Sequence, residues 1–146
     1  MRNYLIAGIA MAATFATTPA FAKDVIVQMK NQGAAGAMVF EPAFIQAMPG
    51  DTVKFVPTDK SHSAQTIAAM LPAGVAPVIG KPNQEMSIKV DKPGIYGIEC
   101  KPHTSMGMVA LIQVGKGPSA NLGAARTVKL PPLAAKRMTP LLAKAR

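Results

Sequence analysis

The feature that most restricts the fold of this chain is a series of short, apolar-rich runs, most of them ended by proline, glycine or asparagine. The runs at 52–56 and 86–90 alternate polar and apolar residues, which predicts strands with one buried face. The run at 108–114 is almost continuously apolar, as expected of a strand in the interior of a core. Short strands at this spacing predict an all-β sandwich or barrel. Further strand-like runs occupy 24–29, 38–42, 44–47 and 95–100.

Two segments between these runs have a different character. Pro42 interrupts an apolar stretch and predicts a sheet edge or a bend there, because proline has no N–H to donate. The segment 63–83 lacks alternation, and within it we expect a short helix at 65–71 followed by a loop.

The C-terminal region of the chain is rich in alanine, leucine and lysine. Its periodicity predicts helices at 120–128 and 133–145, separated by the helix-breaking pair Pro131-Pro132. The second helix carries an apolar stripe that we expect to pack on the sandwich, formed by Leu133, Met138, Leu141 and Leu142.

The N-terminal segment has the pattern of an export signal. A short positive end is followed by an apolar run, and Ala20-Phe21-Ala22 has the small residues of a signal-peptidase site. We therefore expect residues 1–22 to be removed and the periplasm to be the destination. The apolar run is too short to predict a membrane span, so no stable membrane insertion of the mature protein is expected. A sandwich at 23–115 and a helical extension at 116–146 would then form one monomeric unit.

Composition narrows the possible functions. The chain has 146 residues, too few for a kinase or polymerase, and its single cysteine excludes an intramolecular disulfide framework. Lysine and arginine number 16 against 7 acidic residues, a formal charge of +9 that favours an acidic partner. Nucleic acid is not an expected partner, because the chain has no tryptophan and few other aromatic residues to stack on bases.

One short segment gathers soft metal ligands. Cys100 and His103 stand three residues apart, Met106 and Met108 follow, and His62 lies in an upstream loop. Thiolate and thioether are soft ligands and imidazole is borderline, a combination that suits copper as both Cu(I) and Cu(II). Two histidines, a cysteine and a weak axial methionine describe a blue-copper electron-transfer site.

Other interpretations of these residues compete with copper. Alone, the cysteine and methionines would be core residues, and His62 a polar loop residue. Zinc also binds cysteine and histidine, but its structural sites rarely include methionine. A thiol enzyme would need His103 as its base, and no Asn or Asp stands out to orient that ring. The joint pattern favours copper.

The same segments resemble the pseudoazurin family, electron carriers of cupredoxin fold. The resemblance covers the whole chain after the signal, including the helical tail, and rests on the segments Gly36–Ala43, Pro49–Val53, Asp59–His62 and Cys100–Met108. It implies a Greek-key β-sandwich and one copper ion. It also implies that His62, Cys100 and His103 are the strong ligands and Met108 the long axial one.

The resemblance also implies roles around the copper. His103 would reach the surface through an apolar patch of Met38, Pro102 and Met106, with Met38 packed on its ring. Three residues depart from the family pattern: Ser63 replaces an asparagine that ties the two ligand loops, Lys101 a small residue, and Glu99 a basic one. The basic side chains expected around this patch are Lys30, Lys60 and Lys101.

The function implied is single-electron transfer by a carrier that is not an enzyme. By resemblance, its partners are nitrite reductase and c-type cytochromes of denitrification. The alternative is a periplasmic copper chaperone or store, which the ten methionines mildly favour. A chaperone needs exposed, exchangeable ligands, whereas this pattern predicts a buried Cys100.

Overall fold

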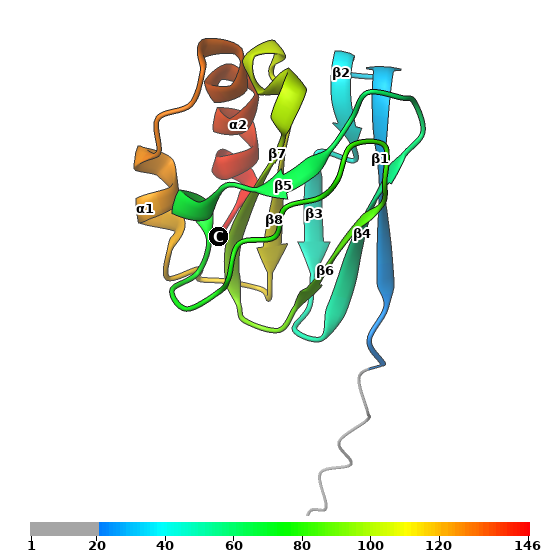
Figure 1. Ribbon diagram of the computed structural model, residues 1–146. Coiled ribbons are helices and arrows are strands. Elements are labelled where there is room, and N and C mark those ends of the chain that lie inside the picture. The colour runs from blue at the N-terminus through cyan, green and yellow to red at the C-terminus, as the bar shows by residue number, and fades with distance from the viewer. Residues whose placement is uncertain (1–20) are drawn as a thin grey trace, which may run out of the picture.

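The computed structural model describes residues 21–146, so the predicted export signal lies outside the described residues except for its last two positions. The described residues form two four-stranded sheets that face each other, one ordered β2-β1-β4-β6 and the other β3-β8-β7-β5 (Figure 1). The all-β sandwich expected from the sequence is confirmed. Its strands are β1 Asp24–Gly33, β2 Gly36–Glu41, β3 Phe44–Ala47, β4 Asp51–Pro57, β5 Ala64–Thr66, β6 Met86–Val90, β7 Gly94–Cys100 and β8 Val109–Val114.

The chain changes sheets at Pro42, where the sequence predicts an edge or a bend. Before it, β2 pairs antiparallel with β1 at the edge of the first sheet. After it, β3 pairs parallel with β8 at the edge of the second sheet. Proline is tolerated there because no ladder hydrogen bond is needed between the two strands.

The second sheet is covered on both faces, which explains why the sequence of its strand β8 is almost continuously apolar. In β8, Ala110 and Ile112 belong to the core between the sheets, whereas Val109 and Leu111 belong to the core under the helices. Every residue of β8 is buried. The strand therefore loses the polar alternation of a one-faced strand, as the run at 108–114 predicts.

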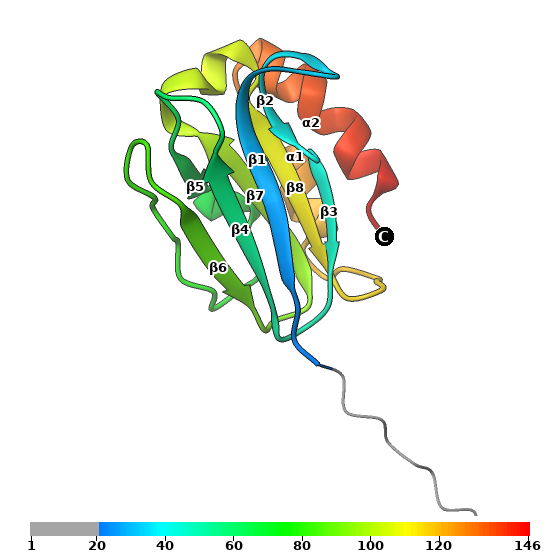
Figure 2. The ribbon, with the colours of Figure 1, turned by 90° about the vertical axis from the view of Figure 1, so that its right-hand side faces the viewer.

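Two α-helices cover the outer face of this sheet. α1 spans Leu122–Thr127 and α2 spans Pro132–Lys144, close to the helices expected from the sequence. Figure 2 shows α2 behind the sandwich when the first sheet faces the viewer. No helix within residues 21–146 is both long and apolar enough to span a membrane.

Two expectations about helices were wrong. Residues 65–71 do not form one helix: Gln65 and Thr66 belong to β5, and only Ala68–Met70 forms a 3₁₀ turn, η1. Pairing of Gln65 with Glu99 on β7 outweighs the local helix propensity. In α2, Met138, Leu141 and Leu142 are buried, but Leu133, in the first turn of the helix, is 50% exposed and does not complete the expected stripe.

Candidate metal centre

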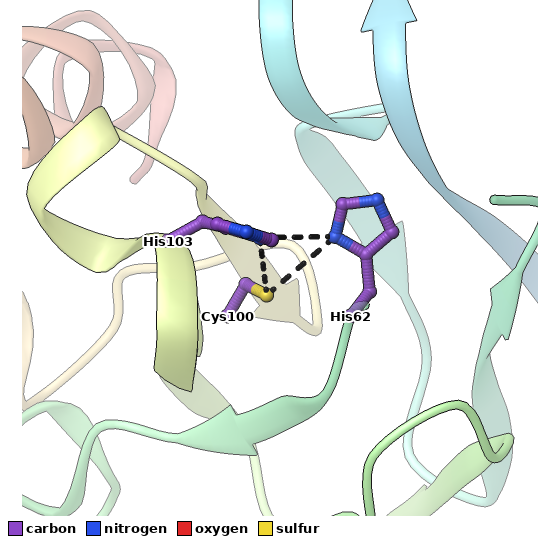
Figure 3. A group of neighbouring side chains, drawn as sticks. All are labelled: His62, Cys100 and His103. Carbon is purple, nitrogen blue, oxygen red and sulfur yellow. Dashed lines mark hydrogen bonds between the residues drawn. The ribbon is translucent and has the colours of Figure 1, made fainter. Parts of the chain in front are cut away.

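Three predicted ligands meet at one end of the sandwich (Figure 3). Cys100 is the last residue of β7, and His103 follows it in the 3₁₀ helix η2, Lys101–Met106. His62 lies in the segment between β4 and β5. Ala64 pairs with Cys100 across β5 and β7, so the antiparallel register brings His62 to the cysteine. Strand pairing thus joins residues that are far apart in the sequence.

The three ligand atoms form a small triangle. Nδ1 of His62 lies 3.2 Å from Nδ1 of His103 and 3.8 Å from Sγ of Cys100, and the remaining side, from His103 Nδ1 to Sγ, is 3.5 Å. A point equidistant from all three atoms lies about 2 Å from each, close to the bond lengths of first-row metals to nitrogen and sulfur. The donors present therefore fit a metal ion, and their softness fits copper.

The two methionines of the loop have different environments. Met108 is fully buried and belongs to the same core cluster as Cys100, whereas Met106 is 45% exposed. Backbone bonds hold Met108 to both neighbouring ligands: its N–H donates to the His103 carbonyl at 3.1 Å, and its carbonyl accepts from the Cys100 N–H at 3.0 Å. Its burial beside Cys100 therefore makes Met108, and not Met106, the candidate fourth ligand.

Burial also controls protonation at the centre. Loss of solvent raises the pKa of the Cys100 thiol, and the same effect, reinforced by nearby His103, lowers the pKa of His62. Both shifts favour the neutral forms in the metal-free chain. Since copper binds the thiolate, its binding must release the thiol proton and becomes stronger as pH rises.

Hydrogen bonds hold the His62 segment in place, including at Ser63, which differs from the family pattern. The Ser63 carbonyl accepts a hydrogen bond from the N–H of Lys101 at 3.2 Å, which joins the two ligand loops without a longer side chain. Asn83 adds two contacts: its N–H donates to the His62 carbonyl at 2.8 Å, and its Oδ1 accepts from the Ser61 N–H at 2.6 Å. Sequence reasoning missed Asn83, because a Pro-Asn pair indicates a turn but not what the turn contacts.

Glu99 also has a structural role at the centre. Its carboxylate accepts from Gln65 Nε2 at 2.6 Å, and the Thr104 hydroxyl lies 3.0 Å from it and 2.8 Å from the Cys100 carbonyl. Glu99 therefore links β5 to η2 around the cysteine. Gln65 and Thr104 were not singled out from the sequence: the pairing of β5 with β7 brings Gln65 to Glu99, and the η2 turn brings Thr104 there.

Most of the residues expected on the surface around His103 are at least partly exposed. His103 and Met38 are partly exposed, and Pro102, Lys60, Lys101 and Met106 are exposed. Lys30 differs from the expectation, because its ammonium pairs with the Glu41 carboxylate and is neutralised there. Of the three lysines, Lys60 and Lys101 are the ones that form none of the ion pairs found within residues 21–146.

Comparison with known proteins gives a consistent result. Residues 27–115 match the family model of copper-binding proteins of the plastocyanin/azurin family. The chain is 48% identical over 143 residues to pseudoazurin of Paracoccus pantotrophus, covering 98% of each chain. It is also similar to the crystal structure of pseudoazurin from Methylobacterium extorquens, with a TM-score of 0.79, 47% identity and coverage of 83% of this chain and 98% of that one.

Proposed function

The chain belongs to the plastocyanin/azurin family of copper-binding proteins, and within it to the pseudoazurins, and we propose that it carries single electrons in the periplasm to a nitrite reductase. Copper, when bound, supplies a one-electron couple. His62, Cys100 and His103 would hold it as strong ligands and Met108 as the axial ligand. The family and the copper site are the premise. The compartment and the partner are the proposal.

The observation that carries the proposal is the unequal exposure of the ligands. Cys100, His62 and Met108 have no exposed surface, whereas His103 is partly exposed beside Met106 and Pro102. Within residues 21–146, the His103 ring therefore offers the one path from the ligand set to the surface. An apolar rim around that ring lets a partner approach closely and exclude water.

The buried ligands also need a rigid support. Cys100 is fixed by strand pairing, Met108 by backbone bonds on both sides, and His62 by Asn83. A scaffold that moves little between the two oxidation states keeps the reorganisation on electron exchange small. This arrangement favours a carrier over a chaperone, because a chaperone must release copper through exposed ligands.

The N-terminal sequence supports the periplasm. Lys23, the first residue after the predicted signal, is already held by the sandwich: its N–H donates to Asp51, and its carbonyl accepts from Thr52. Phe21, inside the predicted signal, is 88% exposed. Removal of residues 1–22 would therefore leave these contacts of Lys23 and Asp51 in place.

The experiment combines a spectrum with a transfer rate. Copper-loaded protein should show an intense thiolate-to-copper band when oxidised. It should pass through repeated cycles of reduction and oxidation with a strong Cu(I) chelator present without losing copper. The reduced protein should then be oxidised in stopped flow by a nitrite reductase, and the oxidised protein should be reduced by a c-type cytochrome.

The outcomes separate the candidate functions. Rapid transfer of Cu(I) to the chelator would reject the electron carrier and favour a copper chaperone or store. Retained copper with no reaction with nitrite reductase would keep the carrier and reject that partner. The Cys100→Ser variant, which lacks the thiolate, is the control for the colour and for the transfer.

A further inference from the structure

Arg137 crosses from the C-terminal helix to the loop that carries Met108. Its Nη1 donates to the carbonyl of Met38 at 2.8 Å and to that of Gly107 at 3.2 Å, and its Nη2 donates to the carbonyl of Ala37 at 3.0 Å. One guanidinium therefore joins three segments of the chain: α2, the edge strand β2 and the end of η2. The planar fork of arginine suits several acceptors at once.

Two of the three carbonyls that Arg137 binds belong to residues with positive φ. Gly107 ends η2 with φ +84°, the left-handed conformation that turns the chain toward Met108. Met38 has φ +50°, which is uncommon and costly for a residue with a side chain. Gly107 directly precedes Met108, and Met38 packs against the core cluster that contains Cys100 and Met108. A cation on its carbonyl helps to hold Met38 in a conformation that the residue does not favour on its own.

The stem of Arg137 also fits the loop closely. A Cβ atom added at Gly107 would lie 3.0 Å from Cδ of Arg137 and 3.2 Å from the Leu133 carbonyl, so the glycine allows the helix to approach. Arg137 takes no part in the ion pairs found within residues 21–146. Its contacts are to backbone carbonyls, so its role is to hold the chain and not to neutralise an acid.

We propose that Arg137 is a positioning residue for the copper site: through Gly107 it fixes Met108 relative to Cys100 and His103, and through Met38 it fixes the rim beside His103. This rests on the proposed copper carrier. It gives the C-terminal helix a role in tuning the metal centre. The axial ligand sets the potential of such a site, so loosening Gly107 changes the spectrum and the potential.

The charge of Arg137 adds a separate effect that the variants must distinguish. A positive charge near the centre disfavours the oxidised state, which carries one more positive charge. Arg137→Lys keeps the charge and most of the stem but loses the fork. Arg137→Met loses both. Lys136→Met is the matched control, because it removes one positive charge from the preceding residue of α2, an exposed lysine.

The first measurement does not need copper. Amide hydrogen exchange is measured in the copper-free chain at Gly107 and Met108, whose N–H groups bond to Thr104 and His103, and at Ile112 in the middle of β8. In Arg137→Lys we expect exchange at Gly107 and Met108 to rise by about tenfold or more, with Ile112 unchanged. Lys136→Met should leave all three rates unchanged.

The second measurement uses the copper-loaded protein. Arg137→Lys should change the relative intensities of the two visible thiolate bands and the rhombicity of the electron paramagnetic resonance spectrum, and shift the potential. Lys136→Met should alter neither spectrum. Unchanged exchange at Gly107 together with an unchanged spectrum in Arg137→Lys would overturn the proposal, even if the global stability fell. Absence of the thiolate band from the wild-type protein would instead reject the copper carrier. The exchange rates, measured without copper, would still show whether Arg137 holds Gly107 and Met108.

Discussion

Cys100 and His62 are completely withdrawn from solvent, so the metal-free chain holds a neutral thiol and a neutral imidazole side by side. Each residue of the centre depends on a neighbour for its position: His62 on Asn83, Met108 on the backbone of Cys100 and His103. The identity of each donor atom and its burial together therefore decide the protonation of these ligands.

The two sulfur ligands have different expected effects on the copper protein. Cys100→Ser should abolish the intense visible band and the redox activity, because the thiolate–copper bond carries both. Met108→Leu should keep the band and shift the potential, because an axial thioether tunes the site without creating it. Visible spectra and voltammetry of both variants test this. A strong band in Cys100→Ser, or an unchanged potential in Met108→Leu, would contradict the ligand assignment.

Asp51 is a buried carboxylate outside the metal centre that makes stability depend on pH. It accepts hydrogen bonds from the N–H of Met48 at 2.8 Å and of Lys23 at 3.0 Å, and these bonds hold its pKa below the usual value. A lowered folded pKa means that the stabilisation is fully present above the unfolded pKa of about 3.9. It is lost as pH falls through the folded value.

We therefore expect Asp51→Asn to be destabilising at neutral pH, by about 2 kcal/mol, since the bonds of a charged acceptor are lost. The difference from wild type should shrink as pH falls below about 4, where Asp51 of the unfolded chain takes up a proton first, and it should vanish below the lowered pKa of the folded carboxylate. Urea unfolding at pH 7 and in acid measures both. Asp91→Asn is the control, because Asp91 is exposed and its ion pair with Lys89 spans 3.4 Å. A pH-independent difference for Asp51→Asn would contradict this account.

At the scale of elements, α2 turns β8 into a strand buried on both faces. Met138, Leu141 and Leu142 belong to the same cluster as Val109 and Leu111 of β8. Without the helix, these β8 side chains would face water. The helix also holds the Met108 loop through Arg137, so the same helix covers the sheet and supports the metal centre.

Truncation of two apolar side chains of α2 to alanine tests how much this cover contributes. Met138→Ala should lower the free energy of unfolding by about 2–4 kcal/mol, because the side chain is 1% exposed and its removal leaves a cavity. Leu133→Ala should cost less than about 1 kcal/mol, because Leu133 is 50% exposed. Chemical denaturation measures both. Equal costs would mean that the helix packs less tightly on β8 than its burial indicates.

At the scale of the whole molecule, the chain carries a formal charge of +9, and the position of that charge matters more than its sum. Lys60 and Lys101, each two residues from a histidine of the metal centre, are exposed, whereas Lys30 is paired with Glu41. Glu99 is engaged by Gln65 and Thr104, beside the cysteine. We therefore expect Lys60 and Lys101, with Arg137, to contribute most of the positive field that meets a partner at the His103 surface.

Association with an acidic redox partner should slow as salt increases, because the Debye length falls from about 30 Å at 0.01 M to about 10 Å at 0.1 M. Lys60→Ala or Lys101→Ala should lower the association rate roughly twofold to fivefold at low salt, with less effect on transfer within the complex. Lys144→Ala, at the C-terminal end of α2, is the charge-matched control. Stopped-flow oxidation across a salt series measures these rates, and equal effects of all three variants would show that only net charge matters.

The sequence by itself determined the strand pattern, the bend at Pro42 and the identities of the metal donors. These are local properties: alternation, a missing N–H and side-chain chemistry are visible in a few consecutive residues. Cys100, His103 and Met108 could be grouped because they share one short loop. His62 could be added because it is one of only two histidines.

Tertiary structure alone decided the partners of these residues. The pairing of β5 with β7 overrode the helix expected at 65–71 and brought Gln65 to Glu99. Asn83 and Arg137 reach the centre from a distant turn and from the C-terminal helix, and neither contact leaves a local pattern in the sequence. A side chain can bond to a backbone carbonyl distant in the sequence only when the fold brings the two within about 3 Å, and no local pattern predicts that distance.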